Sequence, residues 1–216
     1  MNNFRQYQAT DYSNVTYWRE YNKLNIMNNR YQNMVNRMAQ RVKLGYILVR
    51  PNYSIDNAHA THDQNTGQML IEYNPNFMTS LEEYSKWAAM MVIAHEVGHH
   101  HNLDLYGRFS GIDRSSHMKE YNADWFAGWM LRCEGARMDQ ATDVYETYNF
   151  VLSKSHPDEA TRVGALKHGW VSADCKINPP HRVTRTQKNN DVGKALFGAA
   201  AGFALILAIG AIIKSV

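Results

Sequence analysis

Two histidines and a glutamate lie in the segment His95-Glu96-Val97-Gly98-His99, at a spacing that suits metal-dependent chemistry. The apolar stretch 87–94 precedes this segment and predicts a helix. On a helix, residues four apart lie on one face, so His95 and His99 can both bind one zinc ion. Glu96 then lies beside the metal, where it can take a proton from zinc-bound water.

The alternative is a surface helix with scattered histidines. The apolar stretch 87–94 argues against this, because it predicts that the helix is largely buried. Buried histidines and a buried glutamate need partners, since an unpaired polar group is costly to bury. Gly98 suits the close approach of another backbone, although glycine weakens a helix.

A third ligand is available in the helix-compatible segment 119–127. A catalytic zinc ion needs three protein ligands and one open position, and Glu120 completes a set of two histidines and one glutamate. Asp124 is four residues further on and shares its face, so it can accept a hydrogen bond from a ligand imidazole. The alternative is a solvated acidic face, which the neighbours Trp125 and Phe126 disfavour.

With these residues in place, the chain resembles the gluzincin metallopeptidases of the HtpX and CAAX-prenyl-endopeptidase type. The resemblance rests on HExxH, on Glu-x-x-Ala-Asp at 120–124 and on His-Pro-x-x-x-x-Arg at 156–162, where Val163 replaces the usual Ile. Asn-Ala-His-Ala at 57–60 is similar to the family's Asn-Ala-Phe-Ala strand, with His59 in place of Phe. The elements follow the family's order over about residues 44–170.

The resemblance implies a zincin-like fold, one Zn²⁺ per chain and a peptide or protein substrate. It also implies that His156 stabilises the oxyanion and that Arg162 supports the site. The alternative for His156 is an exposed histidine at a helix start, before Pro157. By the same resemblance, an edge strand binds the substrate by strand addition, and 68–73 is the candidate strand.

The helices and strands expected from the sequence predict an α+β fold that is mostly helical with a small antiparallel sheet. By the resemblance, this fold is a minimal gluzincin domain. His100 and His101 are expected at the solvated end of the metal-binding helix. Expected helices cover residues 17–43, 81–101, 117–133, 138–152 and 158–170, and expected strands cover 46–49, 58–62 and 68–73.

The domain organisation expected from the sequence has four parts. An N-terminal helical segment covers 1–43, the metallopeptidase domain 44–170, a basic polar linker 171–194 and a transmembrane helix 195–213. The last segment has no charged side chain and as a helix would reach about 28 Å, close to the thickness of the hydrocarbon core. The alternative is a buried C-terminal helix.

Basic residues precede this span, so the positive-inside rule predicts a single-pass protein with its catalytic domain in the cytoplasm. The start of the chain lacks the apolar region of a secretory signal peptide. Gly198 and Gly202 form a GxxxG pattern that predicts weak helix pairing.

The charge and the cysteines exclude other classes. Six of the 23 basic and two of the 20 acidic residues follow position 170, so the domain itself is about neutral. It has no basic stripe with interleaved aromatics, which predicts no nucleic-acid partner. Cys133 and Cys175 form no disulfide framework in the sequence, and we expect both to be reduced.

These observations favour a membrane-anchored zinc endopeptidase with Glu96 as general base. A second hypothesis is a zinc-bound scaffold or regulatory module at the membrane without proteolytic activity. A third is a lytic protein whose C-terminal segment perforates membranes, which a single short helix disfavours.

Overall fold

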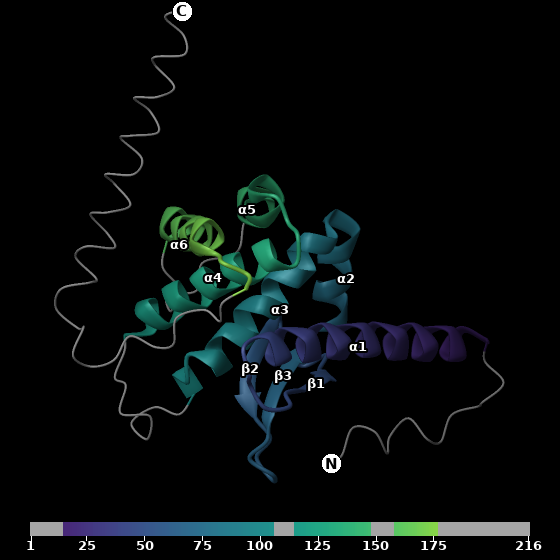
Figure 1. Ribbon diagram of the computed structural model, residues 1–216. Coiled ribbons are helices and arrows are strands. Elements are labelled where there is room, and N and C mark those ends of the chain that lie inside the picture. The colour runs from purple at the N-terminus through teal and green to yellow at the C-terminus, as the bar shows by residue number, and fades with distance from the viewer. Residues whose placement is uncertain (1–14, 106–114, 148–157, 177–216) are drawn as a thin grey trace, which may run out of the picture.

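The computed structural model describes residues 15–105, 115–147 and 158–176 (Figure 1). Over these residues the fold is α+β, mostly helical with one three-stranded sheet, as the sequence predicts. The helices are α1 (Val15–Arg41), α2 (Pro75–Tyr84), α3 (Lys86–His101), α4 (Ser116–Cys133), α5 (Met138–Thr147) and α6 (Glu159–Ser172). The strands are β1 (Leu48–Pro51), β2 (Ala58–His62) and β3 (Met69–Tyr73).

The sheet has the order β1-β3-β2 and is mixed. β2 and β3 form an antiparallel hairpin, in which Ala60 lies opposite Ile71, whereas β1 runs parallel to β3. The prediction of a purely antiparallel sheet is therefore wrong for β1. The predicted edge strand 68–73 is also wrong, because β3 is inserted between the other two strands and β2 is at the edge.

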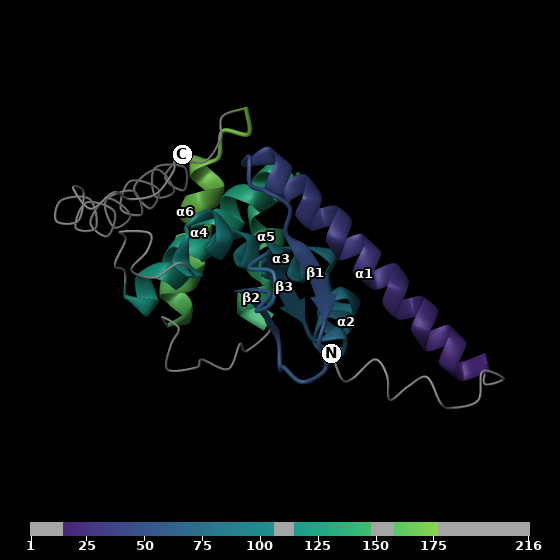
Figure 2. The ribbon, with the colours of Figure 1, turned by 90° about the horizontal axis from the view of Figure 1, so that it is seen from below.

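The outer edges of the two edge strands, β1 and β2, have different hydrogen-bond partners. On the outer edge of β1, the side-chain amide of Gln32 from α1 accepts a hydrogen bond from the N–H of Val49 and donates one to the carbonyl of Ile47, both at 2.8 Å. Gln32 thus makes two hydrogen bonds that a neighbouring strand would otherwise make with this edge. Within the described residues no strand pairs with the outer edge of β2, and the N–H of Ala60 there donates to the Glu96 carboxylate at 2.6 Å. Figure 2 shows α1 along the β1 side, with α4 and α6 on the opposite side of the molecule.

The expected helix 81–101 is interrupted at its start. Ser85 is extended, with φ −159° and ψ 135°, and it both ends α2 and caps α3 by accepting a hydrogen bond from the N–H of Trp87. α2 begins earlier than the sequence pattern indicated, because the side chain of Asn74 caps it and Pro75 occupies its first position. The long helix expected from apolar periodicity is thus two helices.

The core is shared between α1, the sheet and the central helix α3. Methionine and tyrosine side chains of α1 pack in this core, and Tyr31 and Met38 are fully buried there together with Ile71 and Ile93. These side chains pack α3 against α1 and the sheet.

Glycines bring three helices into backbone contact. A Cβ atom at Gly98 of α3 would lie 3.1 Å from the Cα of Ala123 on α4. A Cβ at Gly128 of α4 would lie 1.9 Å from the carbonyl oxygen of Leu166 on α6, a distance that no real side chain reaches. The expected close approach at Gly98 is confirmed, and α4 is held directly between α3 and α6.

Cys133 and Cys175 form a disulfide, with their Cα atoms 5.2 Å apart. The expectation that both are reduced is therefore wrong. The bond joins the last residue of α4 to the segment after α6 and closes a loop of 42 residues in sequence separation. Sequence spacing does not reveal such a pair, because the two cysteines meet only once α6 has packed on α4.

Among the described helices, none is both long and apolar enough to cross a bilayer. The predicted membrane segment 195–213, with Gly198 and Gly202, lies outside the described residues, as does His156.

Candidate metal centre

The side chains of His95 and His99 on α3 and of Glu120 on α4 converge on one point. One ligand atom from each lies within 4.8 Å of the others, an arrangement that could hold a metal ion. The Nε2 atoms of the two histidines are 3.1 Å apart, and the carboxylate oxygens of Glu120 lie 3.2 Å from His95 Nε2 and 3.6 Å from His99 Nε2. The close contact of α3 and α4 at Gly98 brings the three residues together.

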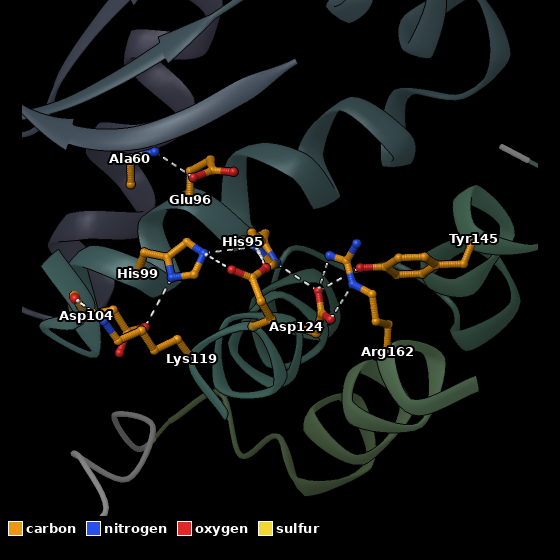
Figure 3. Close-up of polar contacts among 10 residues, drawn as sticks. Ala60, His95, Glu96, His99, Asp104, Lys119, Asp124, Tyr145 and Arg162 are labelled. Atoms are coloured by element: carbon orange, nitrogen blue, oxygen red, sulfur yellow. Dashed lines mark hydrogen bonds and ion pairs between the residues drawn. The ribbon is translucent and has the colours of Figure 1, made fainter. Parts of the chain in front are cut away.

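Behind His95 lies a buried network centred on Asp124. The Asp124 carboxylate is fully buried and lies 2.8 Å from His95 Nδ1, as the sequence predicts (Figure 3). It also accepts a hydrogen bond from the hydroxyl of Tyr145 at 2.7 Å and two from the Arg162 guanidinium, at 2.8 Å and 2.9 Å. Arg162 thus supports His95 through Asp124 and also lines the cavity at the site. Tyr145, a further partner of Asp124, was not predicted from the sequence.

The carboxylates around His95 make the site attractive to a cation. Burial lowers the pKa of His95, but the charge and hydrogen bond of Asp124, with Glu120 and Glu96, outweigh it and raise this pKa above its usual value. Burial raises the pKa of Asp124, but His95 and Arg162 outweigh that effect and hold it below its usual value. An environment that stabilises a proton on an imidazole also favours a bound metal cation.

His99 has a carboxylate partner of its own. Its Nδ1 lies 3.1 Å from Oδ2 of Asp104, which is buried in the turn that follows α3. Leu103, in this turn, has a φ of +59°, and Nζ of Lys119 donates to the main-chain oxygen of Asp104 at 3.0 Å. The sequence analysis missed Asp104, since the turn that directs it back toward His99 has no periodic signature.

Glu96 is buried next to the ligands without belonging to their set. Its carboxylate accepts the hydrogen bond from Ala60 of β2 and faces a cavity of about 360 Å³. The same cavity is lined by the three candidate ligands, by residues of β2 and by apolar side chains of α2 and α3, namely Phe77, Met91 and Val92. A volume of this order is enough for one side chain of a ligand and its backbone.

The remaining histidines of α3 differ from the prediction. His100 and His101 are buried, whereas a solvated helix end was expected. Nε2 of His100 donates to the carbonyl of Leu70 on β3 at 3.1 Å, and the ring of His101 packs on Phe126. The helix is covered up to its last turn because β3 and α4 flank it there.

His59 lines the cavity from β2, and its Nε2 lies 3.3 Å from the Glu72 carboxylate. It is half-exposed and does not belong to the cluster of His95, His99 and Glu120.

Comparison of the chain with models of protein families, with curated proteins and with solved structures found no match. The resemblance to gluzincins therefore rests on the sequence motifs and stays a prediction.

Proposed function

We propose that the chain is a zinc-dependent endopeptidase of gluzincin type. The observation that carries the proposal is the position of Glu96. Its carboxylate lines the same cavity as His95, His99 and Glu120 but is bonded to the sheet rather than to the ligand cluster. A metal centre that is purely structural has no need of a further carboxylate directed into an open cavity.

The donor set fits zinc. Two imidazole nitrogens and one carboxylate form the three-ligand set of a catalytic zinc site, which leaves a fourth position for water or substrate. With the Nδ1 atoms of His95 and His99 each bonded to a carboxylate, both rings can direct an Nε2 lone pair at the same point. When bound, zinc would polarise a carbonyl and lower the pKa of a water molecule.

In this proposal Glu96 takes a proton from the attacking water and returns it to the leaving amine. The hydrogen bond from the N–H of Ala60 holds the carboxylate in place before it accepts the proton. Arg162 acts through Asp124 to hold His95, and His156 remains the proposed donor to the oxyanion.

The substrate that fits best is an extended peptide. It would add to the outer edge of β2, the strand that borders the cavity, and its main chain would pair with Ala58 and with the carbonyl of Ala60, since the N–H of Ala60 is bonded to Glu96. Phe77, Met91 and Val92 would receive an apolar side chain of this peptide.

We further propose that segment 195–213 anchors the enzyme in a membrane. The disulfide between Cys133 and Cys175 favours an oxidising compartment for the domain, whereas the basic linker favours the cytoplasm. Digestion by a protease added outside intact cells distinguishes the two orientations.

The test compares the full-length chain with Glu96→Gln, in zinc content and in cleavage of casein or a peptide library. Glu83→Gln, an exposed glutamate of α2, is the matched control. We expect one zinc ion per chain in all three proteins. Cleavage should persist in the wild type and Glu83→Gln and fall by at least about 10²-fold in Glu96→Gln, because the general base is lost.

Equal cleavage by the wild type and Glu96→Gln would overturn the proposed mechanism. Zinc in all three proteins with no cleavage by the wild type would instead favour the non-proteolytic scaffold. An absence of zinc in the wild type would overturn the proposal that these residues form a zinc centre.

A further inference from the structure

We propose that Asp104 is the positioning residue of His99, and that the left-handed turn at Leu103 and the side chain of Lys119 exist to hold it there. The inference rests on the proposed metal centre and concerns how the second histidine ligand is aimed. The two histidine ligands are thereby supported in different ways. His95 is held by residues of the packed helices α4 and α6, whereas His99 is held by the turn that follows α3.

The geometry of Asp104 determines which ring nitrogen is available. Its carboxylate is nearly inaccessible to solvent, with 1% of the side chain exposed, and lies 3.1 Å from Nδ1 of His99. A carboxylate accepts hydrogen bonds, so it favours the ring form with the proton on Nδ1. The lone pair then lies on Nε2, which faces Nε2 of His95 and the carboxylate of Glu120.

The turn is built to return the chain toward the helix end. α3 ends at His101, and Asn102 is its C-cap, with its N–H bonded to the carbonyl of Gly98. Leu103 then adopts φ +59°, a conformation that a residue with a branched side chain rarely adopts without compensation. The reversal places Asp104 against a histidine five positions before it, which continued helix would not do.

Lys119 fastens this turn to the helix that carries the third ligand. Nζ of Lys119 donates to the main-chain oxygen of Asp104 at 3.0 Å, and the next residue along α4 is Glu120 (Figure 3). The turn that supports His99 is therefore held by Lys119, the residue directly before the ligand Glu120. A shift of the turn relative to α4 would move His99 out of line with Glu120.

The experiment measures metal affinity, which does not require activity. Full-length wild type, Asp104→Asn, Asp104→Ala and Lys119→Met are stripped of metal, and Zn²⁺ is titrated against a chromophoric chelator. Asp139→Asn, an exposed aspartate on α5, is the matched control. Co²⁺ is loaded in parallel, because its visible absorption reports the geometry of the ligands.

We expect Asp104→Ala to weaken Zn²⁺ binding by about 10- to 100-fold, the usual effect of losing the carboxylate behind a histidine ligand. Asp104→Asn should lie between Asp104→Ala and the wild type, since its amide oxygen still accepts from Nδ1 but carries no charge. Lys119→Met should weaken binding by a smaller factor. The Co²⁺ spectrum should shift in the Asp104 variants and stay unchanged in Asp139→Asn.

Wild-type Zn²⁺ affinity and an unchanged Co²⁺ spectrum in a folded Asp104→Asn and Asp104→Ala would overturn the inference, while the metal centre would stand. If Asp104→Ala does not fold, Asp104→Asn decides, because it preserves the volume of the side chain. A wild type that takes up neither metal would overturn the proposed centre first.

Discussion

Two buried histidines of α3, His95 and His100, are five residues apart and have opposite electrostatic environments. Burial lowers the pKa of both rings. At His95 the neighbouring carboxylates reverse that effect, whereas at His100 the carbonyl of Leu70 does not, and the pKa falls to about 4. His62, whose ring contacts that of His100, and His99 lower this pKa further.

The difference shows that exposure does not separate a candidate metal-binding histidine from a packing histidine on this helix. The carboxylates do so, and the largest contributions come from Asp124 and Glu120 of α4, which packs on one face of α3. The opposite face meets the sheet, which offers main-chain groups. One helix can therefore carry a cation-binding centre and a neutral buried imidazole in adjacent turns.

The largest effect should come from removing the positive partner of the carboxylate behind His95. Arg162→Leu leaves the fully buried Asp124 without its guanidinium. We expect the free energy of unfolding to fall by about 3–5 kcal/mol, because the buried carboxylate loses both hydrogen bonds from the guanidinium and, among the described residues, keeps only His95 as a partner of opposite charge. Chemical denaturation of the metal-free protein measures this loss.

Arg137→Leu is the control for this experiment, since Arg137 makes a similar contact with Asp139 on the surface. We expect no measurable change there. An equal response of the two variants would show that burial of the Asp124 network contributes nothing.

Reduction of the disulfide should have a comparable or slightly smaller effect. The loop between Cys133 and Cys175 contains Tyr145 and Arg162, both partners of Asp124, whereas the sheet face of α3 has no such cross-link within the described residues. A loop of 42 residues corresponds to roughly 4 kcal/mol of unfolding free energy, lost when a reductant opens it.

Denaturation curves with and without reductant test this, with the double variant Cys133→Ser/Cys175→Ser as the control that should not respond. Two reactive thiols in the unfolded wild type before any reduction would contradict the disulfide.

A somewhat smaller, pH-dependent effect should come from His100. Its pKa is about 4 in the folded protein and 6.5 when unfolded, so the unfolded chain binds the extra proton between these values. The neutral ring therefore leaves the free energy of unfolding unaffected above pH 6.5. As the pH falls from 6.5 to 4, this free energy decreases by roughly 3 kcal/mol. Thermal or chemical unfolding in chelator across this range measures it.

His100→Gln should remove this part of the acid sensitivity, because the amide does not titrate in that range. All other groups are common to both proteins, so the difference between the two curves isolates His100. Parallel stability curves for the wild type and the variant would contradict the assignment.

The residues predicted from the sequence are those whose relation is local. His95 and His99, and likewise Glu120 and Asp124, lie four apart on their helices, and helical periodicity alone places each pair on one face. The α+β class and the β2–β3 hairpin follow from similar short-range patterns. The two pairs are brought together by the contact between α3 and α4 at Gly98. From the sequence, Gly98 could only be identified as a small residue that suits such a contact.

The features that were missed depend on contacts distant in sequence or on a single backbone angle. The strand order places β3 in the centre, which the local pattern of 68–73 does not indicate. Asp104 reaches His99 only because Leu103 is left-handed, and Tyr145 reaches Asp124 only after α5 packs against α3 and α4. The early start of α2 had a readable signal in Asn74-Pro75, which is typical of a helix start.

The amide of Gln32 has a consequence for self-association. Polymerisation through strand edges requires two open edges on each copy, and here the outer edge of β1 is already occupied. Copies of this chain that paired edge to edge would do so through β2 and would stop at a closed, two-fold dimer. Such a dimer would cover the strand beside Glu96, so self-pairing and peptide binding would be mutually exclusive.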